Sequence, residues 1–124
     1  MPVNRPMHFE ILAKDPVKVS AFYRDVFGWK IEKWDGPMEY WMVNTGEEGT
    51  PGISGGITKR TQSQAVINTV VVENLEAMLK KVVAAGGKKV TGPDQIPGVG
   101  LFAYCADVEG ILFGILQPDM NAKM

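Results

Sequence analysis

Cysteine and histidine are almost missing from this chain of 124 residues, which contains one of each. A single cysteine excludes an intrachain disulfide framework and fits a reducing compartment. It lies in the apolar run LFAYCA, so we expect Cys105 to be a buried, unreactive thiol. The sequence also has no paired-cysteine metal motif, no phosphate-binding glycine loop and no Ser-His-Asp signature.

Long apolar runs and an excess of charge are missing too. No segment approaches the roughly 18 apolar residues of a membrane helix, and the first ten residues lack the apolar core of a signal peptide. Thirteen Lys and Arg face fourteen Asp and Glu, a formal net charge of −1. Such a balance gives no long-range attraction to nucleic acid or anionic membranes. We therefore expect a cytoplasmic, single-domain protein with neither as a partner.

What the sequence does contain is a repeat. GISGGI (52–57) is followed much later by GILFGI (110–115), and the glycines recur at one offset of 58 (110 − 52 and 114 − 56). Asp15 and Asn74, 59 residues apart (74 − 15), each precede an apolar stripe with helical spacing and are typical N-caps. Strand-like runs flank both helices in the order β-α-β-β-β. An internal repeat of this length predicts two copies of one structural unit.

The boundaries of these copies follow from the polar segments. We expect one domain over residues 1–124, with module 1 at about 7–58, a linker at about 59–64, module 2 at about 65–117 and a tail at 118–124. Within module 2, a short strand at 88–92 should precede a loop at 93–100. Each copy has an apolar face that it cannot cover alone, so the two should pack together. Four strands per copy predict a curved half-barrel that encloses a cleft for a small ligand.

The segments HFEI, Asp15-Pro16 and FYRDVFGW, the PGVG before a strand and the D-x-EG turn resemble the vicinal oxygen chelate superfamily. That group includes glyoxalase I, the bleomycin- and fosfomycin-resistance proteins and the extradiol dioxygenases. The resemblance covers about residues 7–117. It implies an α+β fold of two tandem βαβββ modules and leaves the activity open.

The resemblance also implies four positions for ligands to a divalent metal, one in the first and one in the last strand of each copy. These positions fall on His8, Ile67, Gly56 and Gly114, and the last three have no donor side chain. A lone imidazole cannot hold a catalytic ion with useful affinity. We therefore expect no cofactor, with a divalent metal as the lesser alternative. The glycines could enlarge a ligand cavity, or they could serve to bend the sheet.

His8 and Glu10 share one strand face and are the catalytic candidates, as a general base and its partner. Alternatively they form a hydrogen-bonded pair without further role. The ligand-binding candidates are His8, Glu10, Tyr40, Met42, Ser54, Gly56, Thr69, Tyr104 and Gly114. The sequence leaves open whether Tyr40 and Met42, or Trp41 and Val43, line the pocket. The same question concerns Phe102 and Tyr104.

Three functions fit these residues. The first is a metal-free binding protein that holds a small organic molecule in an apolar cleft, as a homodimer like the bleomycin-resistance branch. The second is a lyase, isomerase or dioxygenase that uses His8 and Glu10. The third is a non-catalytic interaction subunit that kept the fold and lost the site.

Overall fold

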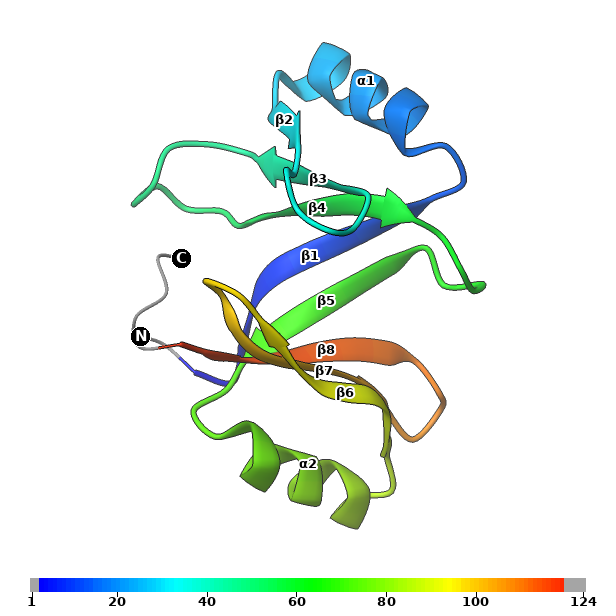
Figure 1. The fold of residues 1–124 in the computed structure, drawn as a ribbon, viewed down its shortest axis with the longest axis vertical. Coiled ribbons are helices and arrows are strands. Elements are labelled where there is room, and N and C mark those ends of the chain that lie inside the picture. The colour runs from blue at the N-terminus through cyan, green and yellow to red at the C-terminus, as the bar shows by residue number, and fades with distance from the viewer. Residues whose placement is uncertain (1–2, 120–124) are drawn as a thin grey trace. The chain divides into compact units, whose positions relative to one another are not determined.

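The computed structural model describes residues 3–119, in which the chain forms eight strands and two helices in the order β-α-β-β-β, twice (Figure 1). This confirms the predicted repeat. The described residues group into an N-terminal unit, His8–Ile67, and a C-terminal unit made of residues 3–7 and 68–119. Residues 120–124 of the expected tail lie outside the described part.

The first copy of the repeat comprises β1 (Arg5–Ala13), α1 (Pro16–Phe27), β2 (Lys30–Lys33), β3 (Tyr40–Asn44) and β4 (Ser54–Lys59). The second comprises β5 (Val66–Val71), α2 (Leu75–Ala84), β6 (Lys88–Ile96), β7 (Gly100–Ala106) and β8 (Leu112–Pro118).

Both helices begin at the residues that the sequence indicated. The carboxylate of Asp15 accepts a hydrogen bond from the backbone N–H of Lys18 at 3.1 Å, and the amide oxygen of Asn74 accepts one from Ala77 at 2.9 Å. Such caps satisfy N–H groups that have no partner within the helix. Helix α1 ends at Gly28, which adopts the left-handed conformation with φ 70°.

The strands of the two units are connected in the same way. In the N-terminal unit the order is β2-β3-β4-β1, and in the C-terminal unit it is β6-β7-β8-β5. The first two pairs in each order are antiparallel, and the last strand of each copy lies parallel to the first. In each copy, the last strand therefore brings its central glycine next to the first strand.

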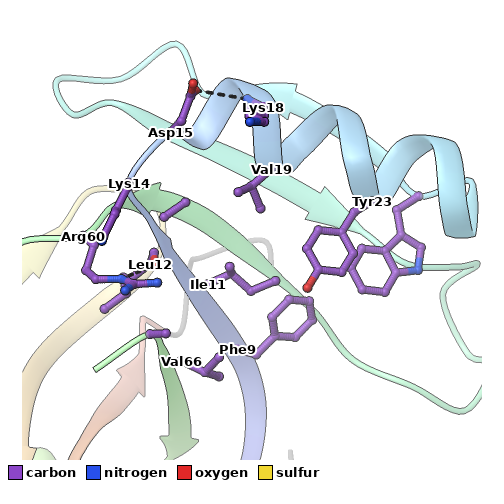
Figure 2. Close-up of a pocket in the computed structure, with 13 residues that line it drawn as sticks. Phe9, Ile11, Leu12, Lys14, Asp15, Lys18, Val19, Tyr23, Arg60 and Val66 are labelled. Carbon is purple, nitrogen blue, oxygen red and sulfur yellow. Dashed lines mark hydrogen bonds between the residues drawn. The ribbon is translucent and has the colours of Figure 1, made fainter. Parts of the chain in front are cut away.

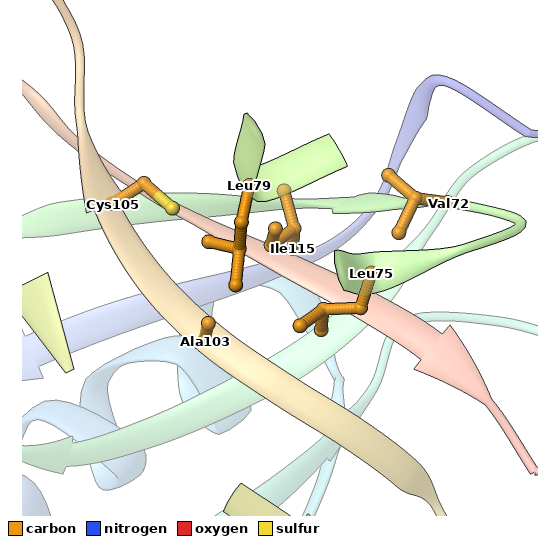
Figure 3. Packing of buried hydrophobic residues seen from close by; sticks show 6 residues of the cluster. All are labelled: Val72, Leu75, Leu79, Ala103, Cys105 and Ile115. Carbon is orange, nitrogen blue, oxygen red and sulfur yellow. The ribbon is translucent and has the colours of Figure 1, made fainter. Parts of the chain in front are cut away.

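Each unit has its own apolar core between the helix and one face of its strands. In the C-terminal unit the core consists of Val72, Leu75, Leu79, Ala103, Cys105 and Ile115 (Figure 3). In the N-terminal unit it consists of Ala13, Ile31, Trp41, Val43 and Ile57. Cys105 is buried, and burial raises the pKa of its thiol, an effect that the charge of Lys89 partly opposes. A raised pKa disfavours the thiolate and fits an inert side chain.

Side chains alternate along a strand, so these cores settle which residues point away from the helices. Trp41 and Val43 pack in the core beside α1, which leaves Tyr40 and Met42 on the opposite face. In the C-terminal unit Ala103 and Cys105 lie in the core, so Phe102 and Tyr104 point the other way.

One strand is longer than the sequence indicated. Strand β6 continues from Lys88 to Ile96, so the expected loop at 93–100 is wrong in its first half. Its pairing with β7 shifts register twice, between Lys89 and Thr91 and between Thr91 and Asp94. Because β6 is the last strand of its order, Pro93 can lie in it without breaking an inner ladder.

Among residues 3–119, neither helix is long and apolar enough to cross a membrane.

Candidate functional site

His8 and Tyr40 form the central contact of the N-terminal unit. Nε2 of His8, on β1, lies 2.9 Å from the hydroxyl oxygen of Tyr40, on β3. Strand β4 runs between these two strands. The tyrosine side chain therefore has to cross β4 to reach the imidazole.

Gly56 makes this crossing possible. A Cβ atom placed on Gly56 would collide with the ring and the hydroxyl of Tyr40. The ring thus lies directly on the backbone of β4, in the space that any other residue would fill. This is the close approach that a glycine inside a strand often marks. It also shows that the idea of an open cavity above Gly56 is wrong, because Tyr40 covers it.

Glu10 lies next to this contact. It is paired with Gly56 across the β1–β4 ladder and is buried, with 7% of its surface exposed. His8 and Glu10 are two residues apart on β1, so they lie on the same face. The cluster therefore combines an imidazole, a carboxyl group and a phenol around one glycine.

Burial affects the charge of the imidazole. Desolvation lowers the pKa of His8 below its ordinary value of 6.5. A lowered pKa keeps the ring neutral at physiological pH, where one nitrogen donates a hydrogen bond and the other accepts. His8 can therefore exchange a hydrogen bond with Tyr40 in either direction and can accept a proton.

The C-terminal unit repeats this arrangement with other residues. Thr69 is paired with Gly114 across the β5–β8 ladder. A Cβ atom on Gly114 would lie 2.7 Å from the ring of Phe102 and 2.8 Å from Oγ1 of Thr69. Phe102 in turn contacts Tyr104 edge-on, with ring centroids 4.6 Å apart. An aromatic ring thus covers the glycine in both units.

The hydroxyl of Thr69 is a second unusual feature of this unit. Thr69 is 2% exposed, and its Oγ1 has no hydrogen-bond partner within residues 3–119. A buried hydroxyl without a partner costs free energy. Such a group is either a cost of the fold or the acceptor of a contact that a ligand would complete.

The predicted site residues fall on one face of each unit. His8, Glu10, Tyr40, Met42, Ser54 and Gly56 share the face opposite α1, which we call the His8 face. Thr69, Tyr104 and Gly114 share the face opposite α2. Met42 is 47% exposed, whereas the hydroxyl of Ser54 is engaged by the backbone N–H of Thr45 at 3.2 Å.

The sequence pattern does not predict two contacts, the hydrogen bond between Tyr40 and His8 and the close approach of the Phe102 ring to Gly114. The signal for both is a glycine in the last strand of each copy, combined with an aromatic residue on the neighbouring strand.

The side chains present do not fit the divalent metal that the family resemblance implies. No group of three or more His, Cys, Asp or Glu residues that could hold a metal ion occurs in the part of the chain that the structure describes. Of the four implied positions, Ile67 is a buried hydrocarbon and the two glycines are covered by Tyr40 and Phe102. The described side chains therefore offer no set of donors for such an ion.

Comparisons with known proteins support the resemblance. A family model described as bleomycin resistance protein-like N-terminal matches residues 5–46. The protein named "Putative glyoxylase CFP32", in Mycobacterium bovis and in Mycobacterium tuberculosis, is 40% identical over 47 residues. Those residues are 38% of this chain and 18% of the relative, so the match spans less than a fifth of the relative's length.

Solved structures match over nearly the whole chain. Methylmalonyl-CoA epimerase from Mycobacterium tuberculosis superimposes with a TM-score of 0.70 at 13% identity, over 94% of this chain and 89% of that one. The Streptomyces coelicolor epimerase bound to methylmalonyl-CoA and NH4+ gives 0.72 at 12%, over 99% and 100%. A hypothetical protein of Bacillus halodurans gives 0.72 at 12%, over 97% and 98%.

Identities this low show the fold alone, and that fold confirms the expected pair of βαβββ modules. Together with the N-terminal family match and the glyoxylase relative, it bears out the resemblance read from the sequence. The chain thus resembles the vicinal oxygen chelate superfamily in its fold and in its N-terminal segment.

Proposed function

We propose that this protein binds a small organic molecule on the His8 face without a divalent metal. The observation that carries the proposal is the position of Tyr40. Its ring occupies the space above Gly56, where the resemblance implies a metal ligand, and its hydroxyl lies 2.9 Å from the remaining implied ligand, His8. One imidazole beside a phenol offers too few donors to hold a divalent ion in the part of the chain that the structure describes, which favours an organic ligand.

The chemistry of the His8 face suggests how such a ligand would bind. Tyr40 and the exposed Met42 offer an aromatic ring and an adaptable thioether to an apolar body. His8 can donate or accept one hydrogen bond, and the buried Glu10 can accept one when ionised. We therefore favour a ligand with a flat apolar body and at least one hydrogen-bonding group.

The family match supports sequestration as the activity. The matching segment, residues 5–46, contains His8, Glu10, Tyr40 and Met42, and its description refers to bleomycin resistance. By analogy with that branch, we propose a cytoplasmic homodimer with two-fold symmetry.

A second candidate is an enzyme that moves a proton. The neutral His8 beside the buried Glu10 could act as a general base and its partner. The fold is shared with methylmalonyl-CoA epimerases, whose solved complexes contain CoA esters. An interaction subunit without a ligand is the third candidate.

The single histidine makes a direct test possible. NMR of the imidazole protons would report on His8 alone. We expect its signals to shift and saturate with an organic ligand, using bleomycin and methylmalonyl-CoA as the first probes, and His8→Gln to weaken binding measured by calorimetry. Turnover of the CoA ester, lost in His8→Gln, would favour the enzyme. Binding of neither probe, with unchanged His8 signals across a wider panel of organic molecules, would favour the interaction subunit.

A further inference from the structure

A groove of about 900 Å³ lies between α1 and β1 in the N-terminal unit (Figure 2). Phe9 and Ile11 of β1 line it, and side chains of a strand alternate between faces. The part of the groove lined by Phe9 and Ile11 is therefore on the opposite side of the strand from His8 and Glu10. The proposed function does not use it.

One end of the groove is aromatic. The rings of Tyr23 and Trp29 are stacked, with centroids 5.0 Å apart and planes inclined by 4°. Phe9 adds a third ring 6.1 Å from Trp29. Ile11 and Val19 lie between these rings and the start of the helix (Figure 2). All five side chains are at least partly exposed, so a flat apolar molecule could lie against them.

The other end of the groove is basic. Lys14, Lys18 and Arg60 line it together with one carboxylate, Asp15. Three cations against one anion leave an excess of two positive charges. Nε of Arg60 donates to the carbonyl of Leu12 at 2.8 Å, which fixes the position of the guanidinium group. Asp15 already accepts the N–H of Lys18 as the helix cap.

The internal repeat shows that the fold does not require these residues. At an offset of 59, the second copy has Glu73 for Lys14 (73 − 14), Ala77 for Lys18, Val82 for Tyr23 and Lys88 for Trp29. The corresponding groove beside α2 measures about 180 Å³ and is lined partly by Val3 and Asn4. The second copy thus forms the same helix and strands without cations at the positions of Lys14 and Lys18, without the stacked rings and without the wide groove, although Lys81 lines its smaller groove.

We propose that the groove is a second binding site, for an organic anion with a flat apolar body. The carboxylate of such a ligand would lie near Lys14, Lys18 and Arg60, and its ring system would pack against Val19, Tyr23 and Trp29. Charge complementarity at one end and aromatic contact at the other define this class of ligand.

The probe is 2-naphthoate, and its uncharged amide, 2-naphthamide, tests the role of the charge. Binding is followed by chemical shifts in ¹H–¹⁵N NMR spectra of the full chain. We expect saturable shifts at Lys18, Val19 and the Trp29 indole, with little change at Tyr40, and weaker binding of the amide. The double variant Lys14→Glu/Lys18→Ala, which carries the residues of the second copy, should bind naphthoate about tenfold more weakly.

The matched control is Lys80→Glu/Lys88→Ala, which changes the net charge by the same amount at exposed positions elsewhere. It should bind naphthoate like the original protein. Four results would overturn the proposal: shifts concentrated at His8 and Tyr40, equal affinity for naphthoate and naphthamide, equal loss in both double variants, or no saturable shift at any concentration that keeps the protein folded. The proposed function is tested with other ligands and with His8→Gln, so this proposal and the proposed function can fail separately.

Discussion

The hydroxyl of Tyr40 lies 2.9 Å from Nε2 of His8, although β4 separates the strands that carry them. The bond exists because Gly56, on β4, has no side chain to hold the ring away. Gly56 lacks the donor side chain that the family resemblance implies at its position. It nevertheless has a structural role, because it leaves room for the Tyr40 ring. Several measurable consequences depend on this relationship.

Substituting Gly56 by alanine should destabilise the protein by about 1–3 kcal/mol, the usual cost of overpacking. In the interior of a strand alanine is otherwise the better residue by about 0.5–1 kcal/mol, so a loss of stability would identify the collision with Tyr40. The measurement is the free energy of unfolding in urea.

Two further variants test the cause of that effect. Gly46→Ala is the control, because the nearest atom to its Cβ is 3.7 Å away. In a Tyr40→Ala background, Gly56→Ala should no longer destabilise. An equal effect of Gly56→Ala with and without the tyrosine ring would contradict this explanation.

The lowered pKa of His8 predicts how stability depends on pH. Folding favours the neutral imidazole, so the unfolded chain binds more protons than the folded one below the ordinary pKa of 6.5. The contribution of neutral His8 to the stability of the folded protein is fully present above pH 6.5 and is lost as the pH falls below that value. Compared with His8→Gln, the original protein should lose more stability between pH 7 and pH 5. Parallel curves for the two proteins would show that folding leaves the imidazole unperturbed.

Removing the buried hydroxyl of Thr69 should raise the stability of the folded protein, whereas Gly56→Ala should lower it. Valine has nearly the same shape, and the hydroxyl has no partner in the described residues. Thr69→Val should therefore stabilise the protein by about 1 kcal/mol, whereas Thr61→Val, at an exposed position, should change little. A clear loss of stability in Thr69→Val would reveal a hydrogen bond to that oxygen.

The sequence was sufficient to predict the repeat, the helix caps and the matching positions of Gly56 and Gly114 in the last strand of each copy. These features depend on local rules, since Asp15 and Asn74 cap helices through neighbouring N–H groups and alternation along a strand separates Tyr40 from Trp41. The length of β6 was not predictable in this way, because Pro93 normally ends a strand and is tolerated only at an edge.

The contact between Tyr40 and His8 could not be predicted from the sequence, for a different reason. It joins residues 32 positions apart and requires a particular rotamer, a particular register of β3 on β4 and a glycine between them. The sequence showed each of these residues but not their combination. For the same reason the sequence allowed the hypothesis that Gly56 and Gly114 enlarge a cavity, although the rings of Tyr40 and Phe102 cover them.

We propose that Tyr40 and Phe102 occupy the space where the family resemblance implies two metal ligands, and that the protein binds no divalent ion there. Calorimetric titration with Ni²⁺ tests this most directly. We expect no saturable heat in the micromolar range and no rise in melting temperature with Ni²⁺, Zn²⁺ or Mn²⁺, because tight binding would stabilise the folded state. Binding of one ion per chain that disappears in His8→Gln would contradict the account.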